Sequence, residues 1–374
     1  MKPKIRVMIN SLSGGGAEKV LVDLLNQLDF SCYEVELLTV TGGIHQKRLP
    51  AGIRHRQIIR CSGEKMSRFF YKLIMKLPRR IFAALFMRGK FDIEIAYLEG
   101  KPTRFVAGKG GKSKKIAFVH CDISKKNIIA PYYRSNEACI REYRKFAKVC
   151  FVSEQSKTGF EKTVGTLDNG CVVHNVVDID RIKRLSQEAA DVEFSPNSRK
   201  MVSVGRLAPE KAFDRLLRCV ASLEDRFPME LIIIGEGPER EKLERIIQQN
   251  HIRSVKLPGY RENPYSIVKQ ADLFVCSSIF EGYSTAVTEA VALGIPVLTT
   301  RCAGMDEILA GGTYGVIVDN SEEALLEELH RFLDDPADYA AIRETVKAGS
   351  REQDCGYSLR EYTELFASVL SEAH

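Results

Sequence analysis

Residues Phe280–Gly294 read F-E-G-Y-S-T-A-V-T-E-A-V-A-L-G, and this stretch decides the fold. One apolar, β-favouring run ends just before it at Cys276, and another begins directly after it at Ile295. Between the two runs, Ser284 is a good helix cap and Gly294 is placed to end the helix. The pattern predicts a strand, a loop, a helix and a strand, with the helix start at the carboxyl edge of a parallel sheet.

Two carboxylates, Glu281 and Glu289, stand in this stretch with seven residues between them. If the helix starts near Ser284, Glu281 precedes it, and Glu289 lies on nearly the same side as the unpaired N–H groups of Thr285 and Ala286. Such a helix start attracts a phosphate, and flanking carboxylates can accept hydrogen bonds from hydroxyls at both ends of a ligand. A diphosphate between a ribose and a sugar fits this layout. For the pair alone, the alternative is one solvated glutamate and one on a helix face.

A second charged motif follows the predicted strand Lys200–Val204. Residues Gly205–Lys211 read G-R-L-A-P-E-K and lead into a helix expected over about Phe213–Phe227. Arg206 and Lys211 can reach one anion from a strand end and a helix start, with arginine giving a forked contact and lysine a point charge. A surface salt-bridge pair is the alternative interpretation.

Together these motifs resemble the retaining glycosyltransferases of family four, the group 1 glycosyl transferases, and especially members that build bacterial capsular and exopolysaccharides. The resemblance implies the α/β fold called GT-B, with two Rossmann-like, doubly wound parallel-sheet domains facing across a cleft. It implies an acceptor-binding domain at 1–178, a linker at 179–199 and a nucleotide-sugar-binding domain at 200–355. A C-terminal helix within 356–374 is expected to cross back to the first domain.

The resemblance also implies roles for individual residues. Glu281 would face the transferred sugar, Glu289 would bind the ribose, and the diphosphate would meet Arg206 and Lys211 without a metal or a cofactor. The expected catalytic residues are Glu281, His120, Arg206 and Lys211. The expected substrate-binding residues are Gly14, Gly15, Gly16, Arg206, Lys211, Tyr260, Arg261, Glu281, Gly282, Tyr283, Ser284, Thr285, Ala286 and Glu289.

In the first half of the chain, a glycine-rich turn at Gly14–Gly16 leads from a strand into a helix, which lets backbone N–H groups approach a phosphate. A tight turn without a ligand is the alternative. Lys19 stands where the dinucleotide fingerprint needs its third glycine, which disfavours an oxidoreductase. His120 directly follows the strand expected at Lys115–Val119, where sites collect in open α/β sheets. A lone histidine is otherwise often structural.

The composition is that of a globular protein long enough for two domains: 374 residues, 44% of them hydrophobic. No run of about eighteen apolar residues exists, and the first strand is too short for a secretion signal. Ten cysteines without a C-x-x-C pair argue against zinc and against a disulfide framework. The expected location is the cytoplasm, with a peripheral position on the inner face of the cell membrane left open.

The net charge of +6 is unevenly distributed, because residues 1–150 have a net charge of +18 and the remainder −12. The segment Glu64–Lys90 combines many basic residues with apolar and aromatic residues at helical spacing. It is typical of an interfacial membrane anchor, although an ordinary surface helix packed on the sheet fits equally well. An anionic membrane surface and a lipid-linked glycan are therefore the expected partners, and nucleic acid is not.

The sequence thus predicts transfer of a sugar from a nucleotide-diphosphate sugar, with UDP favoured, to a lipid-linked or polysaccharide-precursor acceptor. Two alternatives stay open: a GT-B enzyme of another reaction, such as a 2-epimerase or a phosphorylase, and a catalytically silent nucleotide-sugar-binding module. The sugar, the base and the acceptor are not identified by any motif.

Overall fold

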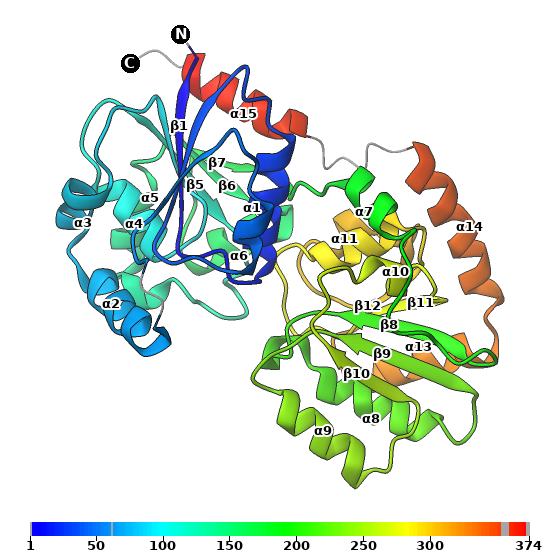
Figure 1. Ribbon diagram of the computed structural model, residues 1–374. Coiled ribbons are helices and arrows are strands. Elements are labelled where there is room, and N and C mark those ends of the chain that lie inside the picture. The colour runs from blue at the N-terminus through cyan, green and yellow to red at the C-terminus, as the bar shows by residue number, and fades with distance from the viewer. Residues whose placement is uncertain (1, 61–62, 353–358, 372–374) are drawn as a thin grey trace. The chain divides into compact units, whose positions relative to one another are not determined.

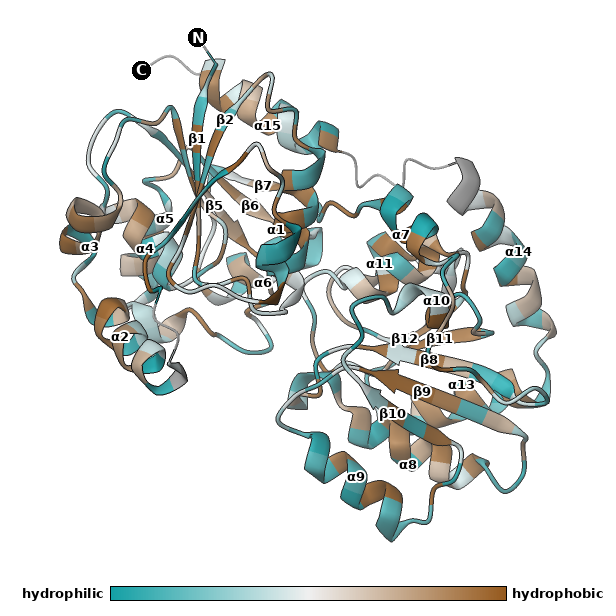
Figure 2. Ribbon diagram, viewed as in Figure 1, coloured by the Kyte–Doolittle hydropathy of each residue, from teal (hydrophilic) through white to brown (hydrophobic). Residues whose placement is uncertain are grey.

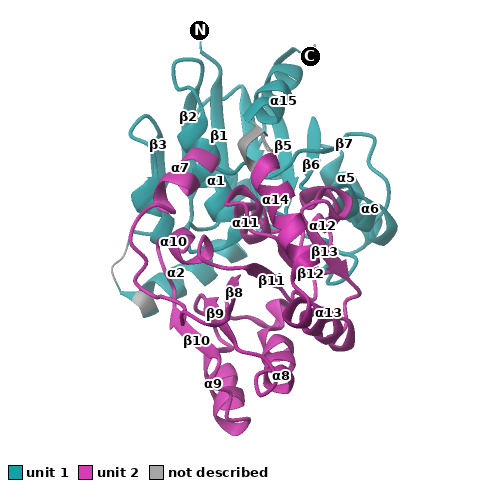
Figure 3. Ribbon diagram, turned by 90° about the vertical axis from the view of Figure 1, so that its right-hand side faces the viewer, with its two compact units in different colours: residues 1–177, 357–374 teal, residues 178–356 magenta. Residues whose placement is uncertain are grey.

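The structure is a computed structural model that describes residues 2–60, 63–352 and 359–371. The chain divides into two compact units, coloured separately in Figure 3. Unit 1 is formed by Met1–Val177 and Tyr357–His374, and unit 2 by Asp178–Gly356. The sequence-predicted start of a C-terminal segment at residue 356 lies outside the described residues.

Unit 1 contains a seven-stranded parallel sheet in the order β3-β2-β1-β4-β5-β6-β7 (Figure 1). Its strands are β1 (Lys4–Ile9), β2 (Glu34–Thr39), β3 (Arg54–Gln57), β4 (Ile93–Ala96), β5 (Lys114–Val119), β6 (Lys148–Phe151) and β7 (Gly170–Val172). Its helices are α1 (Gly16–Gln27), α2 (Glu64–Lys76), α3 (Arg79–Phe86), α4 (Lys101–Gly108), α5 (Asn136–Tyr143), α6 (Glu154–Thr163) and α15 (Leu359–Ser371). Two short 3-10 turns, η1 (Ile44–Arg48) and η2 (Ala130–Tyr132), complete it.

Alternate side chains of the buried strands enter two separate cores, as the period of a strand requires. Val7 of β1 lies in the core beneath α1 and α15, whereas Met8 lies in the core beneath α3, α4, α5 and α6. The ring of Tyr362 from α15 is fully buried and stacks on Phe118 of β5 with centroids 5.6 Å apart. Helices therefore cover both faces of this sheet, and the last helix of the chain belongs to unit 1.

Unit 2 repeats the architecture with a six-stranded parallel sheet in the order β10-β9-β8-β11-β12-β13. Its strands are β8 (Arg199–Val204), β9 (Met229–Ile234), β10 (Val255–Gly259), β11 (Leu273–Cys276), β12 (Val297–Thr300) and β13 (Gly315–Val318). Its helices are α7 (Ile179–Leu185), α8 (Phe213–Leu223), α9 (Arg240–Gln249), α10 (Tyr265–Val268), α11 (Thr285–Ala292), α12 (Met305–Ile308), α13 (Glu322–Asp334) and α14 (Ala337–Glu352), with 3-10 turns η3 (Pro209–Lys211) and η4 (Ala310–Gly312).

The strand order places the region where a ligand binds. In each sheet the order reverses direction once, between β1 and β4 in unit 1 and between β8 and β11 in unit 2. The loops that leave the carboxyl ends of two such strands diverge to opposite faces, and the crevice between them is where open α/β sheets bind ligands. The prediction of two Rossmann-like, doubly wound parallel-sheet units is confirmed.

The prediction of one continuous helix over Glu64–Lys90 is wrong. The chain forms two helices, α2 and α3, separated at Leu77–Pro78, and α3 ends at Phe86. Proline lacks the N–H that a helix interior needs, and its ring clashes with the preceding turn, so the helix must end and restart there. Among the described residues, no helix is long and apolar enough to cross a membrane.

A buried charge cluster fixes the centre of the unit 1 sheet. The fully buried Arg6 of β1 donates from Nε to Glu36 of β2 and from Nη1 to Glu94 of β4, both at 2.9 Å. The same guanidinium lies 3.8 Å from the ring centroid of Phe91. One cation thus ties three neighbouring strands and stays hydrogen-bonded although it is out of contact with water.

We expect Arg6→Ala to lower the free energy of opening of the β1 amides by about 3–5 kcal/mol, because two buried carboxylates lose their shared cation. Hydrogen exchange in a urea series measures this locally in unit 1. Arg54→Ala is the control, since Arg54 contacts the same Glu36 at 3.5 Å with a side chain that is 73% exposed. Arg54→Ala should lower the free energy of opening of the β1 amides by less than about 1 kcal/mol. Equal effects of the two substitutions would refute the assignment.

Candidate active site

Two loops meet at the carboxyl edge of the unit 2 sheet, one after β8 and one after β11. The backbone N–H of Ile279 donates to the carbonyl of Glu210 at 2.8 Å. The hydroxyl of Ser277 donates to the carbonyl of Lys211, also at 2.8 Å. These bonds fasten the turn η3 to the loop after β11. As a result, the side chains of Lys211 and Glu281 face each other.

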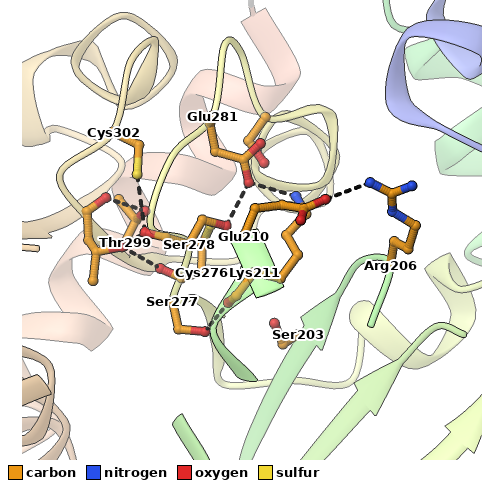
Figure 4. A network of polar contacts seen from close by, with 12 residues as sticks. Ser203, Arg206, Glu210, Lys211, Cys276, Ser277, Ser278, Glu281, Thr299 and Cys302 are labelled. Carbon is orange, nitrogen blue, oxygen red and sulfur yellow. Dashed lines mark hydrogen bonds and ion pairs between the residues drawn. The ribbon is translucent and has the colours of Figure 1, made fainter. Parts of the chain in front are cut away.

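The pair formed by Lys211 and Glu281 is the centre of the site (Figure 4). Lys211 Nζ lies 2.6 Å from Glu281 Oε1, and the two side chains are only 21% and 12% exposed. Burial disfavours the charged amine, but the neighbouring charge of Glu281 outweighs it and raises the pKa of Lys211 above its ordinary value. Lys211 therefore stays protonated at neutral pH and offers a fixed, mostly buried positive charge.

Arg206 lies beside this pair but does not contact it directly. Its Nη2 is 2.5 Å from Glu210 Oε1, and its side chain is 64% exposed. Burial opposes ionisation of Glu210, but a backbone hydrogen bond and the Arg206 guanidinium together lower its pKa. Glu210 thus holds Arg206 at the strand end, with donors of the guanidinium still open to solvent (Figure 4).

The carbonyl of Ser278 anchors the loop that precedes Glu281. It accepts hydrogen bonds from Thr300 Oγ1 at 2.6 Å, Asn320 Nδ2 at 3.2 Å and Arg215 Nη2 at 3.3 Å. The Ser278 hydroxyl in turn donates to Glu281 Oε1 at 2.6 Å. Three separate segments therefore converge on Ser278, and Ser278 orients the Glu281 carboxylate.

The start of helix α11 shares a cavity with Lys211. Ser284 and Ala286 line a small cavity of about 10 Å³ together with Lys211 and Ser278. Ser284 precedes the first residue of α11, Thr285, and its side chain makes no capping hydrogen bond. The structure thus brings the predicted helix start, with its unsatisfied N–H groups, next to the Lys211 ammonium.

The neighbouring loop residues are held by close packing. Tyr283 is buried, and Gly304 lies against it with a positive φ of 77°. A Cβ at Gly304 would stand 2.9 Å from the carbonyl oxygen of Gly282, so only glycine allows the loop after β12 to approach this closely.

Glu289 is buried inside α11, and its Oε1 accepts a hydrogen bond from the Tyr265 hydroxyl at 3.4 Å. This contact places Glu289 against α10. Tyr260 is 48% exposed at the end of β10, and the Arg261 guanidinium is ion-paired with Asp191 at 2.5 Å. Tyr260 is therefore available to a ligand, whereas Arg261 already has a partner.

In unit 1, the glycine turn follows β1 as the sequence indicates. Gly14 adopts a φ of 88°, in the left-handed region that favours glycine, and Gly15 precedes the first residue of α1, Gly16. Because Gly15 has no side chain, it makes no side-chain cap, and the first N–H groups of α1 are not capped by it.

His120 follows β5 directly and lies among aromatic rings, 4.9 Å from the ring centroid of Tyr97. Burial lowers its pKa, so the imidazole is neutral near pH 7. Within the part of the chain that the structure describes, neither ring nitrogen has a hydrogen-bond partner. Buried polar side-chain atoms normally have a hydrogen-bond partner. Glu99, three residues after the neighbouring strand β4, accepts a hydrogen bond from the backbone N–H of His120 at 3.0 Å.

The structure therefore brings together Lys211, Glu281 and the start of α11. Arg206 lies next to them and is held there by its ion pair with Glu210. Glu289 is buried in α11 and contacts Tyr265 of α10. Sequence reasoning missed the residues that orient these groups: Ser278, Arg215, Asn320 and Glu99. None of these four residues lies in a recognisable motif. Glu210, which holds Arg206, does lie in one, as the acidic residue of G-R-L-A-P-E-K. Over residues 2–60, 63–352 and 359–371, no three His, Cys, Asp or Glu side chains cluster closely enough to hold a metal ion.

The fold belongs to a recognised class. The structure of Anabaena Alr3699/HepE in complex with UDP and glucose superposes with a TM-score of 0.75 at 19% identity, covering 99% of this chain and 100% of that one. WaaG, a glycosyltransferase of lipopolysaccharide biosynthesis, gives a TM-score of 0.67 at 17% identity, covering 99% of this chain and 100% of its own. The chain accordingly has the GT-B fold.

A sequence comparison finds a family match within unit 2. Residues 186–349 match the family Glycosyl transferases group 1. An uncharacterized glycosyltransferase of Methanocaldococcus jannaschii is 29% identical over 50% of this chain and 53% of its own length. This chain thus matches about half of that relative.

A second relative aligns over nearly the full length. It is the N-acetylgalactosamine-N,N'-diacetylbacillosaminyl-diphospho-undecaprenol 4-alpha-N-acetylgalactosaminyltransferase of Campylobacter jejuni. It is 24% identical over 94% of this chain and 96% of its own length. The likeness thus extends into unit 1, beyond the residues that the family profile matches.

We expect Ser278→Ala to lower the kcat of transfer at least about tenfold with little change in the KM for the donor. A hydrogen bond to a charged group contributes about 1.5–3 kcal/mol, and without it Glu281 loses its orientation. Ser203→Ala is the control, because the Ser203 hydroxyl is equally buried but donates to the Val275 carbonyl at 2.7 Å. Steady-state kinetics and thermal unfolding of both variants test this. An equal loss of kcat in both would contradict the positioning role.

Proposed function

We propose that this protein is a retaining, metal-independent glycosyltransferase of cell-surface glycan biosynthesis. It would transfer a sugar from a nucleotide-diphosphate sugar, with UDP favoured, to a lipid-linked or polysaccharide-precursor acceptor. Its expected location is cytoplasmic, at the inner face of the cell membrane.

The observation that supports this proposal most strongly is the charge arrangement at the carboxyl edge of the unit 2 sheet. In such a transfer, negative charge grows on the leaving diphosphate as the glycosidic bond breaks. Preorganised positive groups that meet this charge supply the largest share of catalysis in many enzymes. Lys211 is protonated and mostly buried, Arg206 has open donors, and the start of α11 lines the same cavity as Lys211. These groups need no reorganisation when the charge develops.

The named relatives support the choice of substrates. The Anabaena protein was crystallised with UDP and with glucose, which favours a UDP-sugar. The name of the Campylobacter enzyme includes a diphospho-undecaprenol, which favours a polyprenyl-diphosphate-linked acceptor. A relative in Corynebacterium glutamicum is GDP-mannose-dependent, so the base must be tested directly.

Within the proposed reaction, each residue has a distinct task. Glu281 holds hydroxyls of the transferred sugar, and Glu289 binds the ribose. His120 contacts the sugar as a neutral imidazole with free ring nitrogens. The acceptor hydroxyl attacks the anomeric carbon on the face that the diphosphate leaves, and the departing phosphate oxygen accepts the hydroxyl proton. The new glycosidic bond therefore has the same anomeric configuration as the sugar–diphosphate bond that it replaces.

A donor panel tests the function. UDP-sugars should raise the thermal unfolding temperature more than GDP- or ADP-sugars, because a tight ligand stabilises by mass action.

Arg206→Ala and Glu289→Ala should weaken UDP binding in isothermal titration. Glu281→Ala should keep binding but lose about a hundredfold or more in turnover, as loss of one stabilising group commonly costs about 3 kcal/mol. Transfer should persist in a metal chelator.

Arg218→Ala is the matched control, because Arg218 is an exposed arginine of α8 that pairs with Asp214 at 3.5 Å and with Glu322 at 2.7 Å. It should behave as the wild type. Normal transfer by Glu281→Ala would contradict the proposed site. Release of an epimerised sugar or a sugar phosphate without acceptor would instead identify another GT-B reaction.

The proposed membrane location rests on the two faces of α2. Tyr71, Ile74 and Met75 pack against the core of unit 1. A second apolar set points outward at helical spacing and consists of Met66, Phe69, Phe70 and Leu73, which are 57%, 63%, 39% and 52% exposed. Basic residues at the same spacing flank it: Lys65, Arg68, Lys72 and Lys76. Figure 2 shows hydrophobic (brown) and hydrophilic (teal) residues alternating along α2.

This pattern combines both sequence interpretations, since one apolar face packs inward and the other is free for an anionic membrane surface.

We expect Phe69→Ser/Leu73→Ser to weaken cosedimentation with vesicles of phosphatidylcholine and phosphatidylglycerol about tenfold, because two large apolar side chains are no longer transferred from water to the membrane. Leu370→Ser, on α15 with Leu370 36% exposed, is the control. Unchanged binding of the double variant would disprove the membrane role of α2.

A further inference from the structure

A cationic cavity opens in unit 1, apart from the residues assigned to sugar transfer. It has a volume of about 580 Å³ and lies between the start of α3 and the end of α4. Four cations line it, Arg79, Arg80, Lys109 and Lys145, together with small residues that leave it open, Ala83, Ala84, Ala107, Gly108 and Gly110.

The positive charge of this cavity is only partly neutralised. Arg79 pairs with the buried carboxylate of Glu142, which also lies 3.6 Å from Lys145 and 3.6 Å from Arg104. Arg80 and Lys109 make no ion pair with any residue that the structure describes. Partial burial and the charges of Arg79, Arg80 and Arg141 lower the pKa of Lys145. The repulsion from the three arginines, which adds to the effect of burial, is the part of this shift that a bound anion would relieve.

The backbone around the cavity is fixed rather than loose. Gly108 ends α4 directly against α3, and a Cβ there would stand 2.8 Å from the Cβ and Cγ of Arg79. The Lys115 ammonium donates to the carbonyl of Lys109 at 2.7 Å, which holds the loop after α4. The cations therefore surround a preformed hollow, whose open side at Gly110 has no atoms near the position of a Cβ.

We infer that this cavity is a binding site for a phosphate group, contributed by an anionic lipid headgroup or by a soluble phosphate compound. Guanidinium groups give forked contacts to phosphate oxygens and ammonium groups give point charges, so two arginines and two lysines around one hollow match a phosphate. A carboxylate ligand would use fewer of these donors.

The surroundings favour the lipid headgroup as the source. Ile81 and Leu85 are each 48% exposed and directly follow the cavity-lining Arg80 and Ala84 on α3. Apolar side chains beside a phosphate site are the arrangement with which a protein contacts a headgroup and the adjoining acyl region. In this form the inference rests on the membrane location proposed above, while the phosphate site itself does not.

The first experiment measures the site without a membrane. Titration of the full-length protein with inorganic phosphate should shift the backbone amide signals of Gly108 and Gly110 in a saturable way. Arg80→Gln/Lys109→Gln should weaken this binding at least about tenfold, since even one hydrogen bond between charged groups contributes about a factor of ten or more. These two cations are chosen because Arg79 also neutralises the buried Glu142.

The charge-matched control is Arg68→Gln/Lys72→Gln, which removes two exposed cations of α2 outside the cavity. Its affinity for phosphate should equal that of the wild type. Absence of saturable shifts, or an equal loss in both double variants, would overturn the phosphate site and leave diffuse electrostatics as the explanation.

The second experiment identifies the source of the phosphate with vesicles of phosphatidylcholine, alone or mixed with phosphatidic acid. A lipid site predicts that Arg80→Gln/Lys109→Gln binds the mixed vesicles more weakly than the wild type does. If phosphate binding is lost in the cavity variant but its vesicle binding equals that of the wild type, the lipid source is wrong and the ligand is soluble. If the wild type binds no vesicle, the membrane proposal fails, while the phosphate titration still decides the site.

Discussion

The ion pair between Lys211 and Glu281 is the interaction on which the site of unit 2 depends. Each residue leaves the carboxyl end of a different strand, β8 or β11, and these strands are neighbours only because the sheet order reverses between them. A lysine and a glutamate this poorly exposed lose much of their hydration, so the pair persists only if the backbone holds both at contact distance. The hydrogen bonds from Ile279 and Ser277 to the β8 loop do this. The ion pair therefore requires the strand order, the hydrogen bonds between the loops and the two opposite charges at the same time.

The loops achieve this geometry at some local cost. Ala212, which directly follows Lys211, adopts a left-handed φ of 46°, where a residue with a Cβ is disfavoured by about 1–2 kcal/mol. The strain lets the chain turn sharply from η3 into α8 and leaves Lys211 directed toward the loop after β11. Arg215, less than one helical turn further along, then reaches back to the Ser278 carbonyl. Conformational strain at such a point is maintained by the surrounding contacts, and it occurs where a side chain must be aimed.

The sequence was sufficient for the architecture and for the charged residues, because both leave local signals. Alternating apolar runs and helices predict doubly wound sheets, and G-R-L-A-P-E-K and F-E-G-Y-S-T identify Arg206, Lys211 and Glu281. It was not sufficient for Ser278 or Asn320, since a hydroxyl and an amide far apart in the chain carry no pattern before the fold brings them together. The helix break at Pro78 had a local signal, but the apolar periodicity of Glu64–Lys90 continued through it. The contact of Glu289 with Tyr265 depends on how α10 packs, and no spacing encodes that.

The basic character of the first half of the chain acquires a structural meaning from α2 and α3. A helix that only covered a core would need one apolar face, and α2 has two, with Tyr71 facing inward and Phe69 outward. The break at Pro78 gives α3 its own direction, so that Arg79 and Arg80 line a hollow with Lys109 instead of continuing the α2 face. Excess charge spread over a surface would attract any polyanion, whereas cations gathered around a hollow beside apolar side chains select an anion that is attached to an apolar body. This selectivity argues that the charge of unit 1 serves recognition of a phosphate-bearing partner rather than solubility.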